Sequence, residues 1–263
     1  MANKYMARED APFGDDVWAK LDDAMVQAAR GELVGRRLLD IEGPFGLGLK
    51  AVPLPDEEEE SGLVASGMLP LGLIQEPFTL GTRDLAGYER DTTALSTHPV
   101  MEAALAVARQ EDRLIFEGGA GGAGLLTVGD VHEQTLSDWG EVGTAADDII
   151  QAVTTLDDAG FHGPYALALA PERYNLLLRL YERGNRSEIE HVKTIVTEGV
   201  VKAPAMEGGG VMMASGRQYA SIVLGQDMTI GFIGPAGSKV EFMISESLAL
   251  RIRQPGAICV LNG

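Results

Sequence analysis

A run of glycines between Gly119 and Gly124 is the stretch whose spacing comes closest to cofactor chemistry. Its letters, GAGGAG, satisfy the glycine pattern of a dinucleotide-binding turn. Such a turn must lie between a strand and a helix, because the N-terminus of the helix receives the pyrophosphate. Here a helical pattern precedes the glycines, and the stretch LLTVGD that follows them has an extended pattern. The run therefore predicts a flexible connection between a helix and a strand, and a nucleotide-binding enzyme is the less favoured interpretation.

The other residue types that serve catalysis are dispersed along the chain. No two of the four histidines lie three or four residues apart, the spacing of a metal-ligand pair on a helix. They are His98, His132, His162 and His191. The single cysteine, Cys259, stands in the apolar run AICVL, which predicts a buried strand residue and leaves no cysteine pair for a disulfide or a zinc ion. No GxSxG nucleophile motif is present. The sequence thus predicts no enzyme, no metal site and no cofactor.

Charge disfavours one class of partner. The 263 residues include 39 acidic and 21 basic ones, which gives a formal net charge of -18 at pH 7. A field of that sign repels phosphate backbones, so nucleic acid is not expected as a partner. The hydrophobic content of 45% is enough for a substantial core. No stretch reaches the apolar length of a membrane span, and the first residues lack the apolar core of a signal peptide, so we expect a cytoplasmic protein without a membrane partner.

Helical patterns account for the first and middle parts of the chain. One helix is expected from Asp15 to about Leu38, with Gly31 and Gly35 as weak points inside it or as its real end. Another is expected from Thr97 to about Phe116, because apolar residues recur there at helical spacing. Three further helices are expected to begin at a proline or at a capping residue. They start at Thr144, with Asp147 in the capping-box position; at Pro171, running through ERYNLLLRLYERG; and at Ser187, with Glu190 in that position and an end at Gly199.

The rest of the chain is predicted to be extended or irregular. Residues 71–85 suit a strand that Pro77 confines to an edge or a bulge, and the stretches from Val200 onward alternate as strands joined by glycine turns. Between Gly43 and Pro70 lies a glycine- and proline-rich segment, in which the acidic run from Asp56 to Glu60 is predicted to be a solvated loop tip; divalent-cation binding is the less favoured alternative. A loop of that length is usually functional, disordered or stabilised from outside its own domain. Helices followed by strands predict an α+β class and not a doubly wound sheet.

Five stretches of the chain, taken together, resemble a known family. They are LVGRRLLDIEGPFG from Leu33, RQEDRLIFEG from Arg109, GPYALALAPERYNLL from Gly163, LGQDMTIGF from Leu224 and LRIRQPGAICVL from Leu250. In this order and at these spacings they resemble the family 1 encapsulins, the linocin-type (bacteriocin-type) shell proteins of bacterial and archaeal nanocompartments. The resemblance covers nearly the whole chain.

The resemblance implies a fold and a function. The fold would be that of tailed-phage major capsid proteins of the Hong Kong 97 type, in the α+β class. The implied parts are an N-terminal helical arm over residues 1–45, an extended loop over 46–75, a discontinuous peripheral domain over 76–130 and 217–263, and an axial domain over 131–216. The protein would assemble with itself into an icosahedral shell, in its smallest form about 60 copies, and the extended loop would lie over a neighbouring subunit.

The resemblance also implies two kinds of site. The shell would enclose a cargo enzyme, a ferritin-like iron oxidase or a peroxidase, by binding a C-terminal targeting peptide of that cargo. The matching groove positions are Arg36, Asp40, Asp227 and Ile230. The alternative for Arg36 and Asp40 is structural, because they could pair with each other one helical turn apart.

A pore is implied where axial domains meet at the five-fold vertex. By position its lining would be Arg183, Asn185 and Arg186, and a ring of arginines would favour anions. An ordinary turn between two helices is the alternative for this segment. Some relatives bind a flavin through an aromatic residue where this chain has Arg83, and Tyr88 is out of register, so no flavin is expected.

Two competing functions remain open at the level of the sequence. A phage or prophage capsid protein would share the fold and package DNA, although the acidity of the chain argues against it. An enzyme, either the nucleotide binder suggested by the glycine run or a protease, is the alternative of another class.

Overall fold

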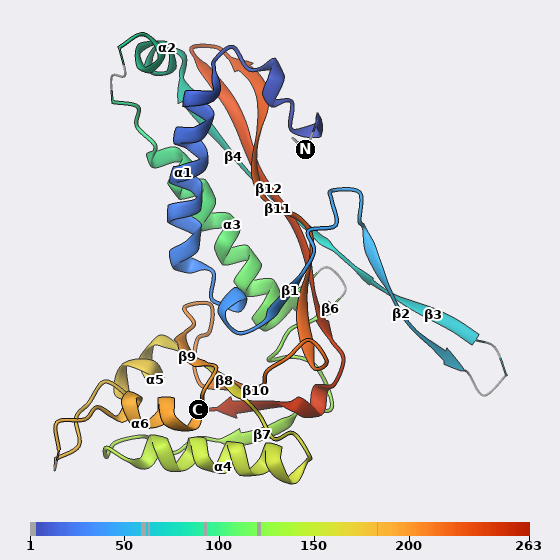
Figure 1. The fold of residues 1–263 in the computed structure, drawn as a ribbon, viewed down its shortest axis with the longest axis vertical. Helices are drawn as coiled ribbons and strands as arrows, with labels where there is room; N and C mark the ends of the chain where they lie inside the picture. The colour runs from blue at the N-terminus through green and yellow to red at the C-terminus, as the bar shows by residue number, and fades with distance from the viewer. Residues whose placement is uncertain (1–3, 59–61, 63, 92–93, 120–121, 183) are drawn as a thin grey trace. The chain divides into compact units, whose positions relative to one another are not determined.

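The computed structural model describes residues 4–58, 62, 64–91, 94–119, 122–182 and 184–263 (Figure 1). These residues fall into two compact units. The first unit holds Met1–Leu33, Gly43–Glu111 and Leu224–Leu248, and the second holds Val34–Glu42, Asp112–Val223 and Ala249–Gly263. Each unit is therefore discontinuous in the sequence.

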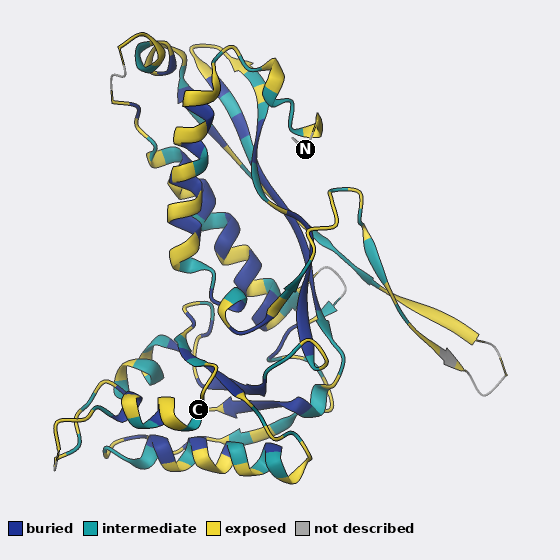
Figure 2. Ribbon diagram, in the orientation of Figure 1, coloured by how far each residue is buried: buried dark blue, intermediate teal, exposed yellow. Residues whose placement is uncertain are grey.

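The helices of the first unit pack an apolar face onto a sheet. They are α1 (Asp15–Glu32), α2 (Thr82–Asp91) and the first part of α3 (His98–Glu117). Val17, Trp18, Leu21 and Met25 are buried on α1 at helical spacing, and the ring of Trp18 lies 5.9 Å from that of Phe242 in the sheet. Figure 2 shows the corresponding buried stripe along the helices. The predicted helix at Thr97 is confirmed within one residue, whereas α2 is not predicted from the sequence.

Four strands form the first sheet, in the order β1-β11-β12-β4. They are β1 (Asp40–Glu42), β4 (Gly72–Gly81), β11 (Ala220–Ala236) and β12 (Lys239–Ile252). Strand β4 pairs antiparallel with β12 and places Pro77 opposite Met243. Because β4 is an edge strand of this sheet, the predicted edge position of Pro77 is confirmed.

The glycine- and proline-rich segment contains a two-stranded ribbon. Its strands are β2 (Ala51–Glu58) and β3 (Val64–Pro70), paired antiparallel with a register shift between Pro53 and Asp56. All residues of β3 up to Met68 are exposed, and the ribbon projects from the sheet of its own unit (Figures 1 and 2). The segment predicted as an extended loop is thus a β-hairpin in its central part.

The second unit is built on a five-stranded sheet in the order β7-β13-β10-β8-β9. Its strands are β7 (His132–Thr135), β8 (Tyr165–Leu169), β9 (Gly199–Lys202), β10 (Gly210–Ala214) and β13 (Ile258–Asn262). The helices of the unit are α4 (Thr144–Asp158), α5 (Pro171–Leu176) and α6 (Glu188–Ile195). Every residue of β8 and β10 is buried, because both faces of these central strands are covered. The core includes Trp139, Leu156 and Cys259, so the prediction of a buried Cys259 is confirmed.

The two compact units cut across the predicted domains, whose boundaries stay a prediction. The prediction places 217–263 with 76–130, but residues 249–263 belong to the second unit together with 112–130 and 34–42. The reason is strand pairing, since β13 lies between β7 and β10 and buries Ile258, Cys259, Val260 and Leu261 there. No local pattern in the sequence tells which sheet a terminal strand joins.

Several predicted element ends are wrong. Helix α1 stops at Glu32, one residue past the alternative end at Gly31, and a short 3-10 helix, η3 (Gly35–Arg37), takes the place of the last turn in the longer prediction. Helix α5 stops at Leu176, well before the predicted end. The stretch after the glycine run is a set of turns and not a strand, with the amide of Leu125 bonded to the carbonyl of Ile115.

The predicted capping signals have mixed outcomes. The capping box of Ser187 and Glu190 at the start of α6 is confirmed, although the helix ends at Ile195. The predicted box of Thr144 and Asp147 is absent, because the N-cap residue of α4 is Gly143. Within the described part of the chain, no helix has the length and apolar character to cross a bilayer.

Candidate functional site

The segment GRR between α1 and β1 is held by a buried carboxylate. Asp112 is 2% exposed, and its side-chain oxygens accept the backbone N–H groups of Val34 at 3.0 Å and of Gly35 at 2.9 Å. A Cβ atom at Gly35 would lie 2.4 Å from Cδ1 of Ile115, so only glycine fits without a shift. Asp112 therefore fixes the backbone from which Arg36 and Asp40 project.

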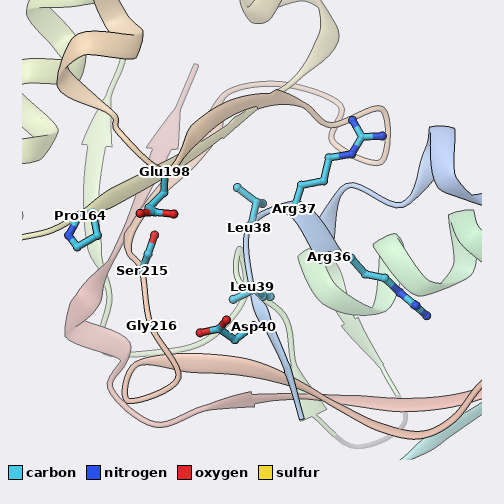
Figure 3. A pocket seen from close by; sticks show the side chains of 9 residues that line it. All are labelled: Arg36, Arg37, Leu38, Leu39, Asp40, Pro164, Glu198, Ser215 and Gly216. Carbon is cyan, nitrogen blue, oxygen red and sulfur yellow. The ribbon is translucent and has the colours of Figure 1, made fainter. Parts of the chain in front are cut away.

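A pocket of about 370 Å³ lies beside this segment in the second unit (Figure 3). Asp40 and Ser215 face it from opposite walls, and the carboxylate of Glu198 lies close to Ser215 (Figure 3). Arg36 points away from Asp40, so the side chains of this pair are not directed at each other (Figure 3). The two residues do not form an ion pair along one helix, because Arg36 lies in η3 and Asp40 begins the strand β1 that follows it.

Asp227 and Ile230 lie on the part of β11 that belongs to the first unit. Asp227 is exposed, and its carboxylate accepts the N–H of Met228 at 2.9 Å while its carbonyl accepts the hydroxyl of Thr229 at 2.8 Å. Ile230 is fully buried. The carboxylate is thus presented at the surface, whereas the isoleucine supports the strand from beneath.

A polar clamp that sequence reasoning missed fixes β1 to β11. Glu42 accepts hydrogen bonds from the hydroxyl of Ser221 and from Nη2 of Arg253, the latter at 2.7 Å. Burial raises the pKa of Glu42, but the hydrogen bonds from Ser221 and Arg253 and the charges of Arg253 and Arg251 outweigh it, so the pKa lies below its usual value. The sequence does carry a signal for this clamp. Charged residues, among them Glu42 and Arg253, stand in the stretches DIE and LRIR, whose pattern is otherwise that of a strand.

The segment predicted to line a pore is a short excursion between α5 and α6. Leu180 and Ser187 form an isolated bridge at its base, and the N–H of Tyr181 donates to the carbonyl of Arg186 at 3.1 Å. Asn185 and Arg186 are exposed. Arg183 lies outside the described residues. The segment is therefore a turn between two helices, and its role as a pore lining stays a prediction.

Two charged residues anchor this excursion, and the sequence analysis missed both. Glu188 is 0% exposed, and its Oε1 accepts the N–H groups of Gly143 at 2.9 Å and of Ala146 at 3.2 Å, which caps α4 from another element. The guanidinium of Arg179 donates to the carbonyls of Trp139 and Gly140 and lies 3.8 Å from Glu188 Oε2. The stems of the excursion are thereby tied to the start of α4.

A tyrosine and a histidine meet at the base of the same excursion. The hydroxyl of Tyr181 lies 3.0 Å from Nδ1 of His191. Burial raises the pKa of Tyr181, and the charges of Glu188 and Asp147 add to the effect, so the phenol stays protonated at neutral pH.

The glycine run does not form a nucleotide site of the expected type. Its described residues belong to a hairpin of two-residue strands, β5 (Gly118–Gly119) and β6 (Gly122–Ala123), which follows α3 instead of opening a helix. The glycines are needed for close approach, since a Cβ at Gly124 would lie 2.3 Å from the nitrogen of Gly118. Residues 120 and 121 lie outside the described part of the chain. Within that part, no group of three or more histidine, cysteine or acidic side chains is arranged to hold a metal ion.

Comparison with known proteins identifies the family. The model of a family described as "Encapsulating protein for peroxidase" matches residues 3–249. The type 1 encapsulin shell protein EncA of Myxococcus xanthus is 32% identical over 98% of this chain and 96% of its own length. A diheme-cytochrome-encapsulin shell fusion protein of Kuenenia stuttgartiensis is 31% identical over 93% of this chain and 72% of its own length.

Solved structures agree at the level of the fold. A virus-like particle from Pyrococcus furiosus superposes with a TM-score of 0.78 at 23% identity, covering 94% of this chain and 99% of the other. The capsid of Myoviridae phage XM1 superposes with a TM-score of 0.62 at 14% identity, covering 86% and 89%. The predicted capsid-type fold is thereby confirmed. With the family match over nearly all of its length, the chain belongs to the encapsulin shell proteins.

Proposed function

We propose that the shell formed by this chain encloses an enzyme, a ferritin-like iron oxidase or a peroxidase, and holds it by a C-terminal targeting peptide. The observation that carries the proposal is the match of residues 3–249 to a family described as encapsulating a peroxidase. The matched range includes every residue assigned to cargo binding, Arg36, Asp40, Asp227 and Ile230. The proposed cargo classes give the shell a role in iron storage or in the response to oxidative stress.

The two carboxylates of the proposed cargo site suit a basic peptide. Asp40 faces a pocket, and Asp227 is exposed on β11. Exposed charges of this kind orient a charged ligand and make its binding sensitive to salt. Ile230 would act from beneath, because a fully buried side chain shapes the strand without touching a peptide.

The test is a shell in which both Arg36 and Asp40 are replaced by alanine. A fluorescent reporter carries the C-terminal peptide of a ferritin-like protein or peroxidase from the same organism and is co-expressed with the shell. We expect shells of unchanged size with at least roughly tenfold less enclosed reporter, because a lost charge-assisted contact of about 1.5 kcal/mol weakens binding by that factor.

A control separates the site from a general effect of charge. Lys20 and Asp23 are exposed on α1, and their double replacement by alanine removes the same two charges. This control shell should retain the reporter. Equal loading of the Arg36 and Asp40 variant would contradict the assignment of the site, and failure of that variant to assemble would show that the pair is structural.

The remaining parts of the proposal concern the shell itself. We propose an icosahedral shell of about 60 copies in the cytoplasm, with no catalytic role and no cofactor of its own. The curated relatives carry names of shell proteins, which supports a structural role. Arg83 and Tyr88 both lie on α2, and neither supplies the aromatic residue at the position implied for flavin. The net charge of -18 favours a protein cargo over DNA, against a phage capsid function.

The excursion around Arg186 is proposed as the lining of the five-fold pore. Asn185 and Arg186 are exposed there, and Arg183 is included by its place in the sequence. Arg179 and Glu188 tie the two ends of the excursion to the start of α4. These contacts within the second unit would therefore fix how far the excursion reaches into the pore. Arginines repeated around a five-fold axis would favour small anions.

A further inference from the structure

The residues before α1 lie across the sheet of the first unit as a strap. We use "strap" for residues 4–11, which form two 3-10 turns, η1 (Lys4–Met6) and η2 (Arg8–Asp10), with no buried residue in either turn. Figure 1 shows this stretch beside β11 and β12. A segment whose side chains are at most half-buried gains less hydrophobic stabilisation than a core element and is easier to displace.

Beneath the strap is a polar floor that β11 and β12 build between them. Gln226 is 6% exposed, and its side-chain amide donates to the hydroxyl of Ser245 at 2.9 Å and to the carbonyl of Ser245 at 3.3 Å. The sulfur of Met6 lies 3.6 Å from the Ser245 hydroxyl and 3.9 Å from the Gln226 amide. A thioether is a weak acceptor, so the floor keeps its own hydrogen bonds whether or not Met6 is present.

The strap and the floor fit closely at one point. A Cβ atom at Gly231 would lie 3.2 Å from the carbonyl oxygen of Met6 and 3.3 Å from its sulfur. This glycine therefore lets the backbone of another segment approach β11. Gln226 and Gly231 are the neighbours of Asp227 and Ile230 in the chain, so the strap lies beside the part of β11 that we assign to cargo binding, while Asp227 itself stays exposed.

The strap is fastened at its end nearest α1. Nη2 of Arg8 lies 2.7 Å from Oδ2 of Asp22, and the guanidinium stacks over the ring of Trp18 at 4.1 Å from its centroid. Phe13 then joins the aromatic cluster, 5.1 Å from the ring of Trp18. A partly exposed ion pair and one cation–π contact are modest interactions, so Arg8 is a latch that a competing ligand can open.

We propose that the strap is an autoinhibitory segment that occupies the β11 surface until the targeting peptide of a cargo protein displaces it. The identity of the competitor rests on the proposed function, whereas the self-occupation of the surface does not. Occupation by the strap reduces the apparent affinity for cargo in proportion to the fraction of subunits whose surface is free. Loosening the strap should therefore raise loading without any change in the peptide-binding residues.

The first experiment uses the strap sequence itself as the probe, which makes it independent of any cargo. A fluorescent reporter ending in KYMAREDA is co-expressed with a shell that lacks residues 1–11, and the enclosed reporter per particle is measured. Roughly tenfold more reporter is expected in this shell than in the full-length shell, because the vacated surface accepts the segment from another chain. A reporter with a scrambled strap sequence serves as the blank. Equal enclosure of the two reporters would overturn the inference.

A second variant covers the case in which the truncated shell does not assemble. Arg8→Ala keeps the whole chain and removes only the latch, and Lys20→Ala removes an exposed cation from α1 as the matched control. The strap reporter should be enclosed several-fold more by the Arg8→Ala shell than by the control. The same enclosure in both would show that Arg8 does not hold the segment.

A last arm separates this inference from the proposed function. The reporter with a cargo-derived C-terminal peptide should load better into the Arg8→Ala shell than into the full-length shell. Suppose that Arg8→Ala raises the enclosure of the strap reporter, while the cargo reporter loads equally into the Arg8→Ala and full-length shells. Cargo then binds elsewhere, and the autoinhibitory role is overturned. If the cargo reporter loads into neither shell, the proposed function fails, while the strap reporter still decides self-occupation.

Discussion

Glu42 shows how one carboxylate can hold the strand that leads into the projecting hairpin. Its partners, Ser221 and Arg253, come from β11 and from the residue just past β12, and Arg253 also donates to the carbonyl of Arg217 at 2.8 Å. The side chains of Glu42 and Arg253 are 21% and 27% exposed. A pair at this depth contributes more than a surface ion pair and loses part of that gain to desolvation.

Replacement of Glu42 by glutamine should lower the stability of the subunit and flatten its acid dependence. We expect a loss of about 1–3 kcal/mol at pH 7, because Arg253 keeps its position without a charged partner. The folded pKa of Glu42 lies below the usual value of 4.5, so its contribution is present above that pH and is lost as the pH falls through the folded pKa. Urea unfolding between pH 7 and pH 3 measures both effects. An identical pH dependence for the variant and the parent would contradict this role.

At the scale of elements, the junction after α1 depends on a glycine that contacts the second half of α3. Gly35→Ala should destabilise the fold by about 1–3 kcal/mol, because the new methyl group would meet Ile115 at 2.4 Å and force a shift in a packed region. Gly31→Ala is the matched control, since nothing lies within 4 Å of a Cβ there and alanine is the better helix former. Thermal unfolding of the two variants should move in opposite directions. An unchanged melting temperature for Gly35→Ala would show that the side chain of Ile115 moves aside without loss of stability.

Elements with a strong local signal follow the sequence closely. Helix α3 has its proline near the start and an apolar stripe over its whole length, and α6 has a real capping box. The misses depend on distant partners. The ribbon of β2 and β3 is missed because its sequence shows little apolar alternation. The cap of α4 is missed because the residue that supplies it, Glu188, lies far along the chain. Strand β13 is an ordinary apolar run, and no local rule identifies β7 and β10 as its neighbours.

The candidate sites are likewise predictable only in part. The family resemblance supplies the positions of Arg36, Asp40, Asp227 and Ile230, but it does not tell that Ile230 is buried or that Arg36 points away from Asp40. Both outcomes depend on strand alternation and on the 3-10 turn at Gly35, which is set by Asp112 far along the sequence. The position of the strap is likewise not predictable from the sequence, because the contacts of Met6 with the sheet are with residues more than two hundred positions away.

At the scale of the whole molecule, the chain is a building block with exposed apolar side chains on its projecting hairpin. The ribbon of β2 and β3 keeps Val64 and Met68 more than half exposed. Apolar side chains on a two-stranded ribbon favour burial against another surface, and a neighbouring copy in a shell offers one. The account therefore predicts that the fold is completed by assembly.

Electron microscopy of the purified protein at native pH tests this central claim most directly. The account predicts closed icosahedral particles of about 60 copies, in which five subunits surround each vertex. It also predicts that the β2–β3 ribbon of one copy lies against its neighbour in the reconstruction. A monomer or a small open oligomer at native pH would contradict the account.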